Sequence, residues 1–133
     1  MNLPSAIQPG LKGSVSLIVE QEHTAQHLGS GGVQVLATPQ MVLLMERAGV
    51  AAVDHLLPEG YRTVGAHLDV GHTAPTPIGF EVTATAELME VAGRRLVFHV
   101  QVQDSVEVVG EGTHQRFIIN VQRFSERVAQ KTR

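Results

Sequence analysis

The longest hydrophobic pattern of the chain lies between Thr38 and Leu57 and predicts a helix. Apolar residues recur there at steps of three and four, which is the spacing of one helix face. This face comprises Met41, Leu44, Met45, Ala48, Ala52 and Leu56. Further apolar residues flank it, so we expect the helix to be buried and wrapped by a sheet. Pro39 suits the first helical turn, and Pro58 cannot continue the helix.

Five other stretches alternate between apolar and polar residues, as half-buried strands do. They cover residues 11–20, 61–70, 79–91, 95–107 and 112–124. Ala92-Gly93 and Val109-Gly110 predict hairpin turns between the last three of them. The turn-rich connection over 21–32 has room for a short helical piece. The two ends, 1–10 and 125–133, are expected to be loosely ordered.

The order of these elements indicates an α+β fold rather than alternating βαβ units. One strand and one long helix are followed by four strands joined by short turns. A five-stranded antiparallel sheet can bury a single helix by curling around it, which is the hotdog fold. The length of 133 residues corresponds to one domain. Such a sheet leaves an edge and one apolar side of the helix uncovered, so we expect a homodimer or a dimer of dimers.

Composition narrows the classes of function. The chain has no cysteine, which excludes disulfides, thiolate nucleophiles and cysteine zinc sites. The formal net charge is −3 and no basic run stands out, so nucleic acid is not an expected partner. No run of apolar residues is long enough to predict a membrane span, and the N-terminus lacks the pattern of a signal peptide. A cytoplasmic protein with no membrane partner is the simplest expectation.

Three polar residues in apolar or turn surroundings are candidates for chemistry: Thr38, Glu46 and His72. A histidine can pass protons near neutral pH, and a carboxylate or a hydroxyl can act as nucleophile or orient a neighbour. Each also has a structural interpretation. Thr38 can cap the helix, Glu46 can pair with Arg116, and His72 can hydrogen-bond its own turn. Regular helix separates Thr38 from Glu46 by about 12 Å along the axis, so their direct contact requires a loop or a second subunit.

Two further patterns are weak. His67, Asp69 and His72 are metal-ligand residue types, but their spacing matches no zinc site. The glycine-rich segment 29–32 lacks the lysine of a phosphate-binding loop. His114 is expected to buttress the sheet. We therefore expect neither a metal nor a retained cofactor.

Three segments resemble one family of enzymes: VLATPQMVLLMERA, VGAHLDVGHTAPTPIGFEVTATAELMEVAGRRL and EGTHQRFIINVQRF. They are similar to hotdog-fold acyl-CoA thioesterases, above all those of the fluoroacetyl-CoA thioesterase group, from about residue 11 onward. The resemblance implies that Thr38, Glu46 and His72 are the catalytic set. It implies that Gly65 and Arg116 belong to the same pocket. Coenzyme A is then part of the substrate and a product, rather than a cofactor.

The chain departs from that group just before the threonine. Members specific for fluoroacetyl-CoA carry a phenylalanine-rich segment there, whereas residues 28–34 of this chain read LGSGGVQ. Without bulky aromatic side chains a closed gate that excludes water is harder to build, so we expect a small or medium acyl-CoA as substrate. Two alternatives stay open: a hydratase or dehydratase of acyl thioesters on the same fold, and a non-catalytic module that binds acyl-CoA.

Overall fold

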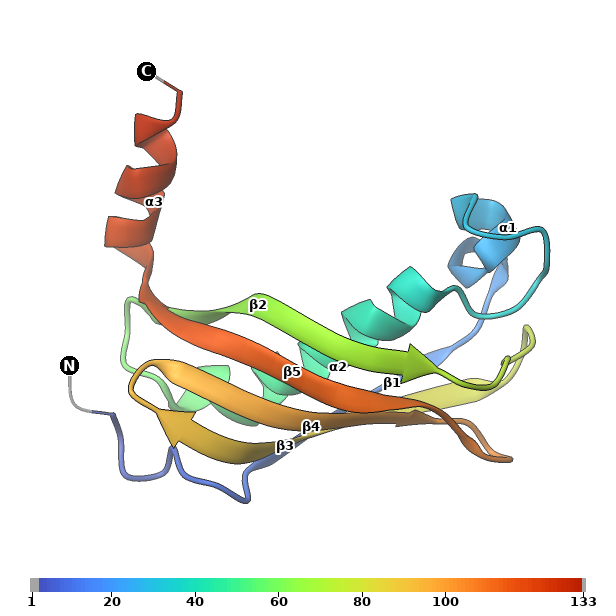
Figure 1. The fold of residues 1–133 in the computed structure, drawn as a ribbon, viewed down its shortest axis with the longest axis horizontal. Coiled ribbons are helices and arrows are strands. Elements are labelled where there is room, and N and C mark those ends of the chain that lie inside the picture. Colours follow the sequence, from blue (N-terminus) through green and yellow to red (C-terminus); the bar gives the residue numbers. More distant parts are fainter. Residues whose placement is uncertain (1–2, 133) are drawn as a thin grey trace.

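The computed structural model describes residues 3–132 as one antiparallel sheet with a central helix (Figure 1). The strands are β1 (Lys12–Ile18), β2 (Tyr61–His72), β3 (Glu81–Ala92), β4 (Arg95–Gln103) and β5 (Val108–Asn120). The α-helices are α1 (Ala25–Leu28), α2 (Thr38–Val53) and α3 (Val121–Gln130), and short 3₁₀ turns are η1 (Gln21–His23) and η2 (Asp54–Leu56). The strand order is β1-β3-β4-β5-β2, so β1 and β2 form the two edges. This topology confirms the predicted hotdog arrangement.

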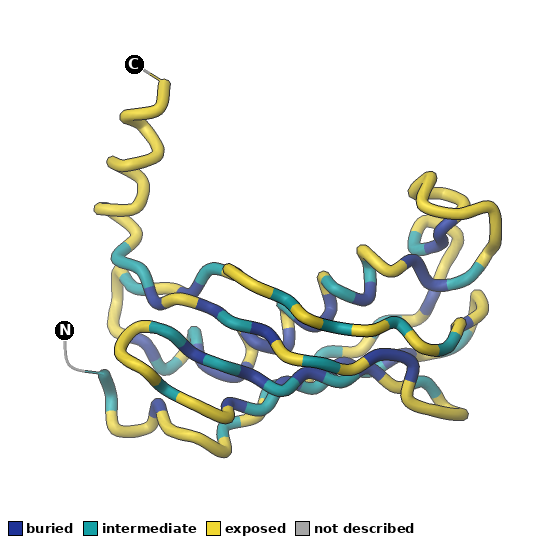
Figure 2. The backbone as a smooth tube through the Cα atoms, viewed as in Figure 1, coloured by how far each residue is buried: buried dark blue, intermediate teal, exposed yellow. Residues whose placement is uncertain are grey.

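Helix α2 lies in the concave face of the sheet, and its predicted apolar face forms the core. Met41, Met45 and Ala48 have no exposed surface. They pack against the inward residues of β3 and β4, whose alternation between buried and half-buried positions follows the strand period. Figure 2 shows the buried positions along α2 and the middle of the sheet. Gly13 in β1 allows the backbone of α2 to approach closely, because a Cβ atom there would lie 2.4 Å from the Ala48 carbonyl oxygen.

A β-bulge at Ala66 changes which side chains of β2 face the helix. Gly65 pairs with Arg116 and His67 pairs with Gln115, so Ala66 is an extra residue in β2. In a regular strand, Gly65 and His72 would lie on opposite faces because seven positions separate them. The bulge restores both to the helix side of the sheet. The uniform alternation predicted over 61–70 is therefore wrong before the bulge, where buried Thr63 and not Val64 points inward.

The predicted turn at Val109-Gly110 is also wrong, because both residues lie buried inside β5. The chain reverses between Asp104 and Glu107 instead. The Asp104 carboxylate accepts hydrogen bonds from the backbone N–H groups of Val106 and Glu107, at 2.8 and 3.0 Å. An aspartate side chain that closes its own turn is a local signal that the glycine obscured. The other hairpin is confirmed, with Gly93 at φ 63° between β3 and β4.

The two chain ends carry more structure than expected. Strand β5 stops at Asn120, whose side chain accepts a hydrogen bond from the Arg123 N–H at 3.0 Å and begins helix α3. Residues 121–124 were predicted as strand and 125–130 as part of a loose end, but all belong to this helix. At the other end, Ile7 is buried in the core, and the Gly10 N–H donates to the Leu88 carbonyl.

Candidate active site

The first residue of α2 contacts the last residue of β2. Thr38 Oγ1 lies 2.7 Å from His72 Nδ1. Ala37, and not Thr38, is the residue that caps the helix, and it provides no side-chain hydrogen bond. The structural interpretation of Thr38 as a helix cap is therefore wrong. Its hydroxyl group is committed to the imidazole instead.

Backbone hydrogen bonds hold both partners of this contact in place. The Ala37 N–H donates to His23 O, and the Leu36 N–H donates to Thr76 O at 2.8 Å. The residue after His72 is tied to β5, because the Thr73 N–H donates to Val109 O at 2.8 Å. The start of α2 and the end of β2 are thus connected independently of their side chains. The Thr38–His72 contact rests on this frame.

His72 is suited to accept a proton near neutral pH. Burial lowers the pKa of His72 below its ordinary value of 6.5, and the backbone of Ala74 offsets part of this effect. The neutral imidazole is then the main form at pH 7. The second ring nitrogen, Nε2, is buried and has no hydrogen-bond partner among the described residues. Buried polar atoms rarely stay unpaired, so this atom is a candidate for contact with a ligand.

A pocket of about 410 Å³ opens beside the Thr38–His72 contact. It is lined by Ala25, Ser30, Val35, Leu36, Thr38, His72, Thr73, Ala74 and Pro75. Ser30 is the only one of residues 28–34 in this lining, and no lining residue is phenylalanine, tyrosine or tryptophan. The absence of these three residue types agrees with the sequence of residues 28–34. The lining also contains no lysine or arginine.

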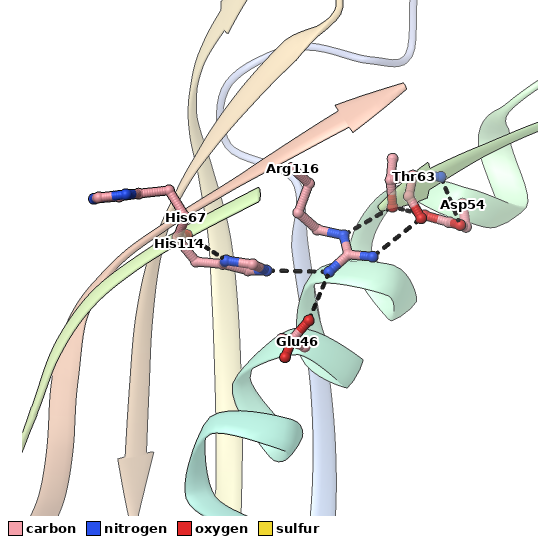
Figure 3. Close-up of polar contacts among 6 residues, drawn as sticks. All are labelled: Glu46, Asp54, Thr63, His67, His114 and Arg116. Carbon is pink, nitrogen blue, oxygen red and sulfur yellow. Dashed lines mark hydrogen bonds and ion pairs between the residues drawn. The ribbon is translucent and has the colours of Figure 1, made fainter. Parts of the chain in front are cut away.

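Glu46 belongs to a second polar group, further along α2 (Figure 3). Its Oε2 atom lies 3.8 Å from Nη1 of Arg116, and the side chains are 36% and 5% exposed. Arg116 of β5 is therefore buried, while Glu46 of α2 is partly exposed to solvent. The predicted pairing of Glu46 with Arg116 is confirmed. This pairing does not remove Glu46 from chemistry, because the contact is longer than a hydrogen bond.

Arg116 is held by three hydrogen bonds, none of them to Glu46. Nε donates to the Thr63 hydroxyl at 2.8 Å, Nη2 donates to the Thr63 carbonyl at 3.1 Å, and Nη1 lies 3.1 Å from His114 Nε2. Thr63 in turn donates its backbone N–H to the Asp54 carboxylate. Burial lowers the pKa of Arg116, while Asp54 and Glu46 act in the opposite direction. The two carboxylates balance one buried guanidinium charge.

The proton position on His114 follows from its two contacts. Its Nδ1 lies 2.9 Å from the carbonyl oxygen of His67, which can only accept, so Nδ1 carries the proton. Nε2 then offers its lone pair to Arg116. Burial lowers the pKa of His114, and the charge of Arg116 acts in the same direction. His114 stays neutral and orients the arginine, which agrees with the supporting role expected for it.

Gly65 lies directly opposite Glu46. A Cβ atom at this position would be 2.6 Å from Glu46 Oε2 and 3.4 Å from Nη1 of Arg116. Any larger residue at position 65 would clash with the Glu46 carboxylate in its observed position. The structure thus brings Gly65, Arg116 and Glu46 together in one group and Thr38 with His72 in another. Eight positions of helix separate the two groups within one copy of the chain.

Sequence reasoning missed part of the second group. Asp54 and Thr63 connect η2 to β2 and hold Arg116, but neither residue belongs to a motif. The only signal was the position of Asp54 at the end of the long helix, where a carboxylate is unfavourable beside the helix dipole. His67 contributes through its backbone alone. Among residues 3–132 no cluster of histidine and carboxylate side chains is arranged to hold a metal ion.

Residues 19–122 match the family described as fluoroacetyl-CoA-specific thioesterase, FlK. The chain belongs to this family. The fluoroacetyl-CoA thioesterase of Streptantibioticus cattleyicolor is 46% identical over 99 residues, which cover 74% of this chain and 71% of that protein. This membership confirms the prediction of a thioester hydrolase.

Solved structures agree with the family assignment. One structure of the fluoroacetyl-CoA thioesterase FlK superposes with a TM-score of 0.88 at 38% identity, covering 96% of this chain and 98% of that chain. A hot-dog-like protein from Thermanaerovibrio acidaminovorans gives a TM-score of 0.89 at 25% identity, covering 98% of this chain and 97% of that chain. No helix within residues 3–132 of this family member has the length and hydropathy to span a bilayer.

Proposed function

We propose that this thioesterase hydrolyses small or medium acyl-CoA thioesters, with Thr38, His72 and Glu46 as catalytic residues. The observation that carries the proposal is the 2.7 Å contact between Thr38 Oγ1 and His72 Nδ1 in the wall of the pocket. A neutral imidazole bonded to a hydroxyl group can move the proton that thioester cleavage requires. Membership of a thioesterase family supports the reaction class. Coenzyme A leaves as a product, and the proposed chemistry uses no metal or retained cofactor.

Two routes for the attacking oxygen fit this arrangement. In the first, the Thr38 oxygen attacks the carbonyl carbon while His72 Nδ1 takes the hydroxyl proton. The carbon–sulfur bond then breaks, the thiolate of coenzyme A receives that proton, and water hydrolyses the acyl-threonine ester to the free acid. In the second, Glu46 attacks or activates water, and Thr38 binds the carbonyl oxygen. Rapid quenching and mass spectrometry separate the routes by an acyl group on Thr38, on Glu46 or on neither.

The proposed site needs a second copy of the chain, because one copy keeps Glu46 away from the Thr38–His72 contact. Two features support a homodimer across the β2 edge. Strand β2 pairs only with β5, so its outer backbone groups have no partner strand within residues 3–132. The outer face of α2 presents Leu43 and Val50, 46% and 38% exposed, one turn to either side of Glu46. Glu46 would then face the Thr38–His72 pair of the second copy.

Gly65 and Arg116 have supporting roles in this proposal. Gly65 leaves room for the Glu46 carboxylate. In the proposed mechanism its backbone N–H would donate to the carbonyl oxygen on which negative charge develops during attack. Arg116 orients the Glu46 carboxylate through their ion pair of 3.8 Å. Neither role requires the arginine to touch the substrate.

The test is a panel of thioesters from acetyl-CoA and fluoroacetyl-CoA to medium and aryl acyl-CoA, assayed by release of free thiol. We expect kcat/KM to rise with acyl length. Each methylene group that contacts the apolar wall should stabilise the bound substrate by at most about 0.8 kcal/mol. We expect little preference for fluoroacetyl over acetyl, because no phenylalanine, tyrosine or tryptophan lines the pocket. A preference of about a thousandfold would overturn the proposed substrate range.

Variants separate catalysis from binding. His72→Ala is expected to lower turnover by about 10²–10⁴. The matched control is His99→Ala, which removes a half-exposed histidine bonded to Glu111 on β5. Hydration of an enoyl-CoA without thiol release would favour the hydratase alternative. Tight acyl-CoA binding with turnover no better than that of a Thr38, Glu46 and His72 triple alanine variant would indicate a binding module.

A further inference from the structure

Three arginines surround a small hollow where α3 leaves the sheet. Arg94 comes from the β3–β4 hairpin, and Arg123 and Arg127 come from successive turns of α3. The hollow has a volume of about 200 Å³. Its other lining residues are Ile119, Asn120 and Phe124. Cationic groups thus gather around an apolar wall that includes an aromatic ring, 42% exposed.

No ion pair within residues 3–132 engages this arginine cluster. The ion pairs of residues 3–132 engage Arg95 and Arg116 but none of Arg94, Arg123 and Arg127. All three are exposed. The chain as a whole carries a net charge of −3, so this concentration of cations is local. Arginine forks match phosphate oxygens in geometry, and a nearby aromatic ring can stack on a nucleobase.

The pocket at Thr38 and His72, by contrast, lacks cationic side chains. Coenzyme A carries a pyrophosphate and a 3′-phosphate at its nucleotide end, and these groups need cationic partners. The lining of the pocket contains no lysine or arginine. A substrate bound there must therefore find its phosphate partners elsewhere.

Symmetry brings the pocket and the arginine cluster together. Figure 1 shows α1 and α3 at opposite ends of the sheet, both projecting on the side of the β2 edge. A two-fold axis normal to the sheet would pair the two β2 strands antiparallel. The Tyr61 end of one strand, which adjoins Asn120 and α3, would then lie beside the His72 end of the other. Helix α3 of one copy would stand next to α1 and the pocket of the second copy.

We propose that Arg94, Arg123 and Arg127 of one copy bind the phosphates of the acyl-CoA whose thioester lies at Thr38 and His72 of the second copy. Phe124 and Ile119 supply the wall for the adenine ring. The pantetheine arm spans the interval between the arginine cluster and the catalytic pair. This inference rests on the proposed function and on the dimer across the β2 edge.

The first test compares two substrates with the same acyl group. One is the acyl-CoA, and the other is the acyl thioester of N-acetylcysteamine, which has no phosphate. In an Arg123→Gln/Arg127→Gln variant, KM for the acyl-CoA should rise about tenfold or more at nearly constant kcat, since hydrogen bonds to charged groups are among the strong ones. The kcat/KM for the truncated thioester should stay unchanged. Added salt should weaken acyl-CoA turnover in the wild type more than in the variant.

The control is Lys12→Gln, which removes one positive charge on β1, at the opposite edge of the sheet. This variant should leave kcat/KM unchanged for both substrates. Equal losses for both substrates in the double variant would show that the arginines act through folding or assembly and would overturn the inference. Unchanged KM for the acyl-CoA would overturn it as well. If the wild type cleaves neither thioester, the proposed function itself fails, which is a different result.

The second test asks whether the two parts come from different copies. His72→Ala chains are refolded together with Arg123→Gln/Arg127→Gln chains, and activity is measured at low acyl-CoA concentration. In the proposed arrangement, a mixed dimer contains one site with both an intact His72 and intact arginines, so low-KM activity returns. If each site takes its arginines from its own chain, no mixed dimer has an intact site. Failure to recover activity in verified mixed dimers would contradict the shared site.

Discussion

The Thr38 side chain does not cap its own helix. A side chain that caps a helix start stabilises a protein by about 1 kcal/mol, and Ala37 in the cap position provides no such bond. The Thr38 hydroxyl group, one residue later, bonds His72 instead. A helix start without a side-chain cap, next to a histidine with an unpaired buried nitrogen, is typical of a site arranged for a ligand.

At the scale of this residue pair, the pH profile should report His72. Its pKa lies below 6.5 because burial disfavours the imidazolium form. A protonated His72 cannot accept a proton, so kcat/KM should be level through pH 7 and fall only as the pH drops below about 6.5. The measurement is kcat/KM against pH for the wild type and for His99→Ala, which should share one profile. An acid limb with its midpoint above pH 7 would contradict this assignment.

A substitution at Gly65 tests whether activity depends on the position of the Glu46 carboxylate. In a Gly65→Ala variant the new methyl group would displace the Glu46 carboxylate, because their separation would be 2.6 Å. We expect activity to fall by about ten- to a hundredfold, since small displacements of a catalytic group are costly. The melting temperature should change little, because a half-exposed side chain can move aside. Gly71→Ala is the control on the same strand, with its nearest neighbour at 3.7 Å. Equal activity in the two variants would remove Gly65 from the site.

At the scale of elements, one buried arginine connects β2, β5 and the end of α2. Arg116 from β5 donates to Thr63 of β2, which is bonded to Asp54 of η2. Removing the guanidinium would leave the lone pair of His114 and the Thr63 oxygens without their donors. A buried polar group that loses its partner destabilises the fold by more than the intact hydrogen bond stabilised it, because the group stays desolvated.

Arg116→Met should therefore lower the free energy of unfolding by about 3–5 kcal/mol. The control, Arg95→Met, breaks a surface ion pair of 3.6 Å with Glu90 and should change it by less than about 1 kcal/mol. Urea denaturation of both variants at pH 7 measures the difference. Comparable losses in the two variants would show that the Arg116 bonds are not a main support of the sheet.

At the scale of the whole molecule, assembly and activity should be inseparable. Leu43 lies on the outer face of α2, beside Glu46, and Leu43→Lys would put a charge into the proposed interface. We expect this variant to be monomeric by light scattering and nearly inactive, because Glu46 then has no second copy to face. Met89→Lys, at a 53% exposed position of β3, is the control and should stay dimeric and active. A wild-type monomer of 14.3 kDa with full activity would overturn the dimer.

Local patterns were sufficient for the long helix, for most of the strands and for the candidate chemical groups. The helix face of α2, the alternation in β3 and β4 and the turn at Gly93 follow from side-chain periodicity and backbone sterics, which act over a few residues. The turn at Asp104 and the helix cap at Asn120 also depend on local side-chain hydrogen bonds. The glycine at 110 and the apolar alternation over 112–124 favoured other interpretations of these segments. Thr38, Glu46 and His72 stood out as polar residues in apolar or turn surroundings, and the motif resemblance implied that they form a catalytic set.

Only the tertiary structure decided which of these groups meet. The bulge at Ala66 turns His72 toward Thr38, and a bulge depends on pairing with β5 rather than on the sequence of β2. Thr63 of β2 connects Arg116 of β5 to Asp54 of η2. Such contacts join segments that are distant in the sequence, so the periodicity of one segment cannot predict them. The arginine cluster arises in the same way, since Arg94 and α3 come together only when the sheet is assembled. Residue spacing determines faces along one element, whereas contacts between elements depend on the register and curvature of the folded sheet.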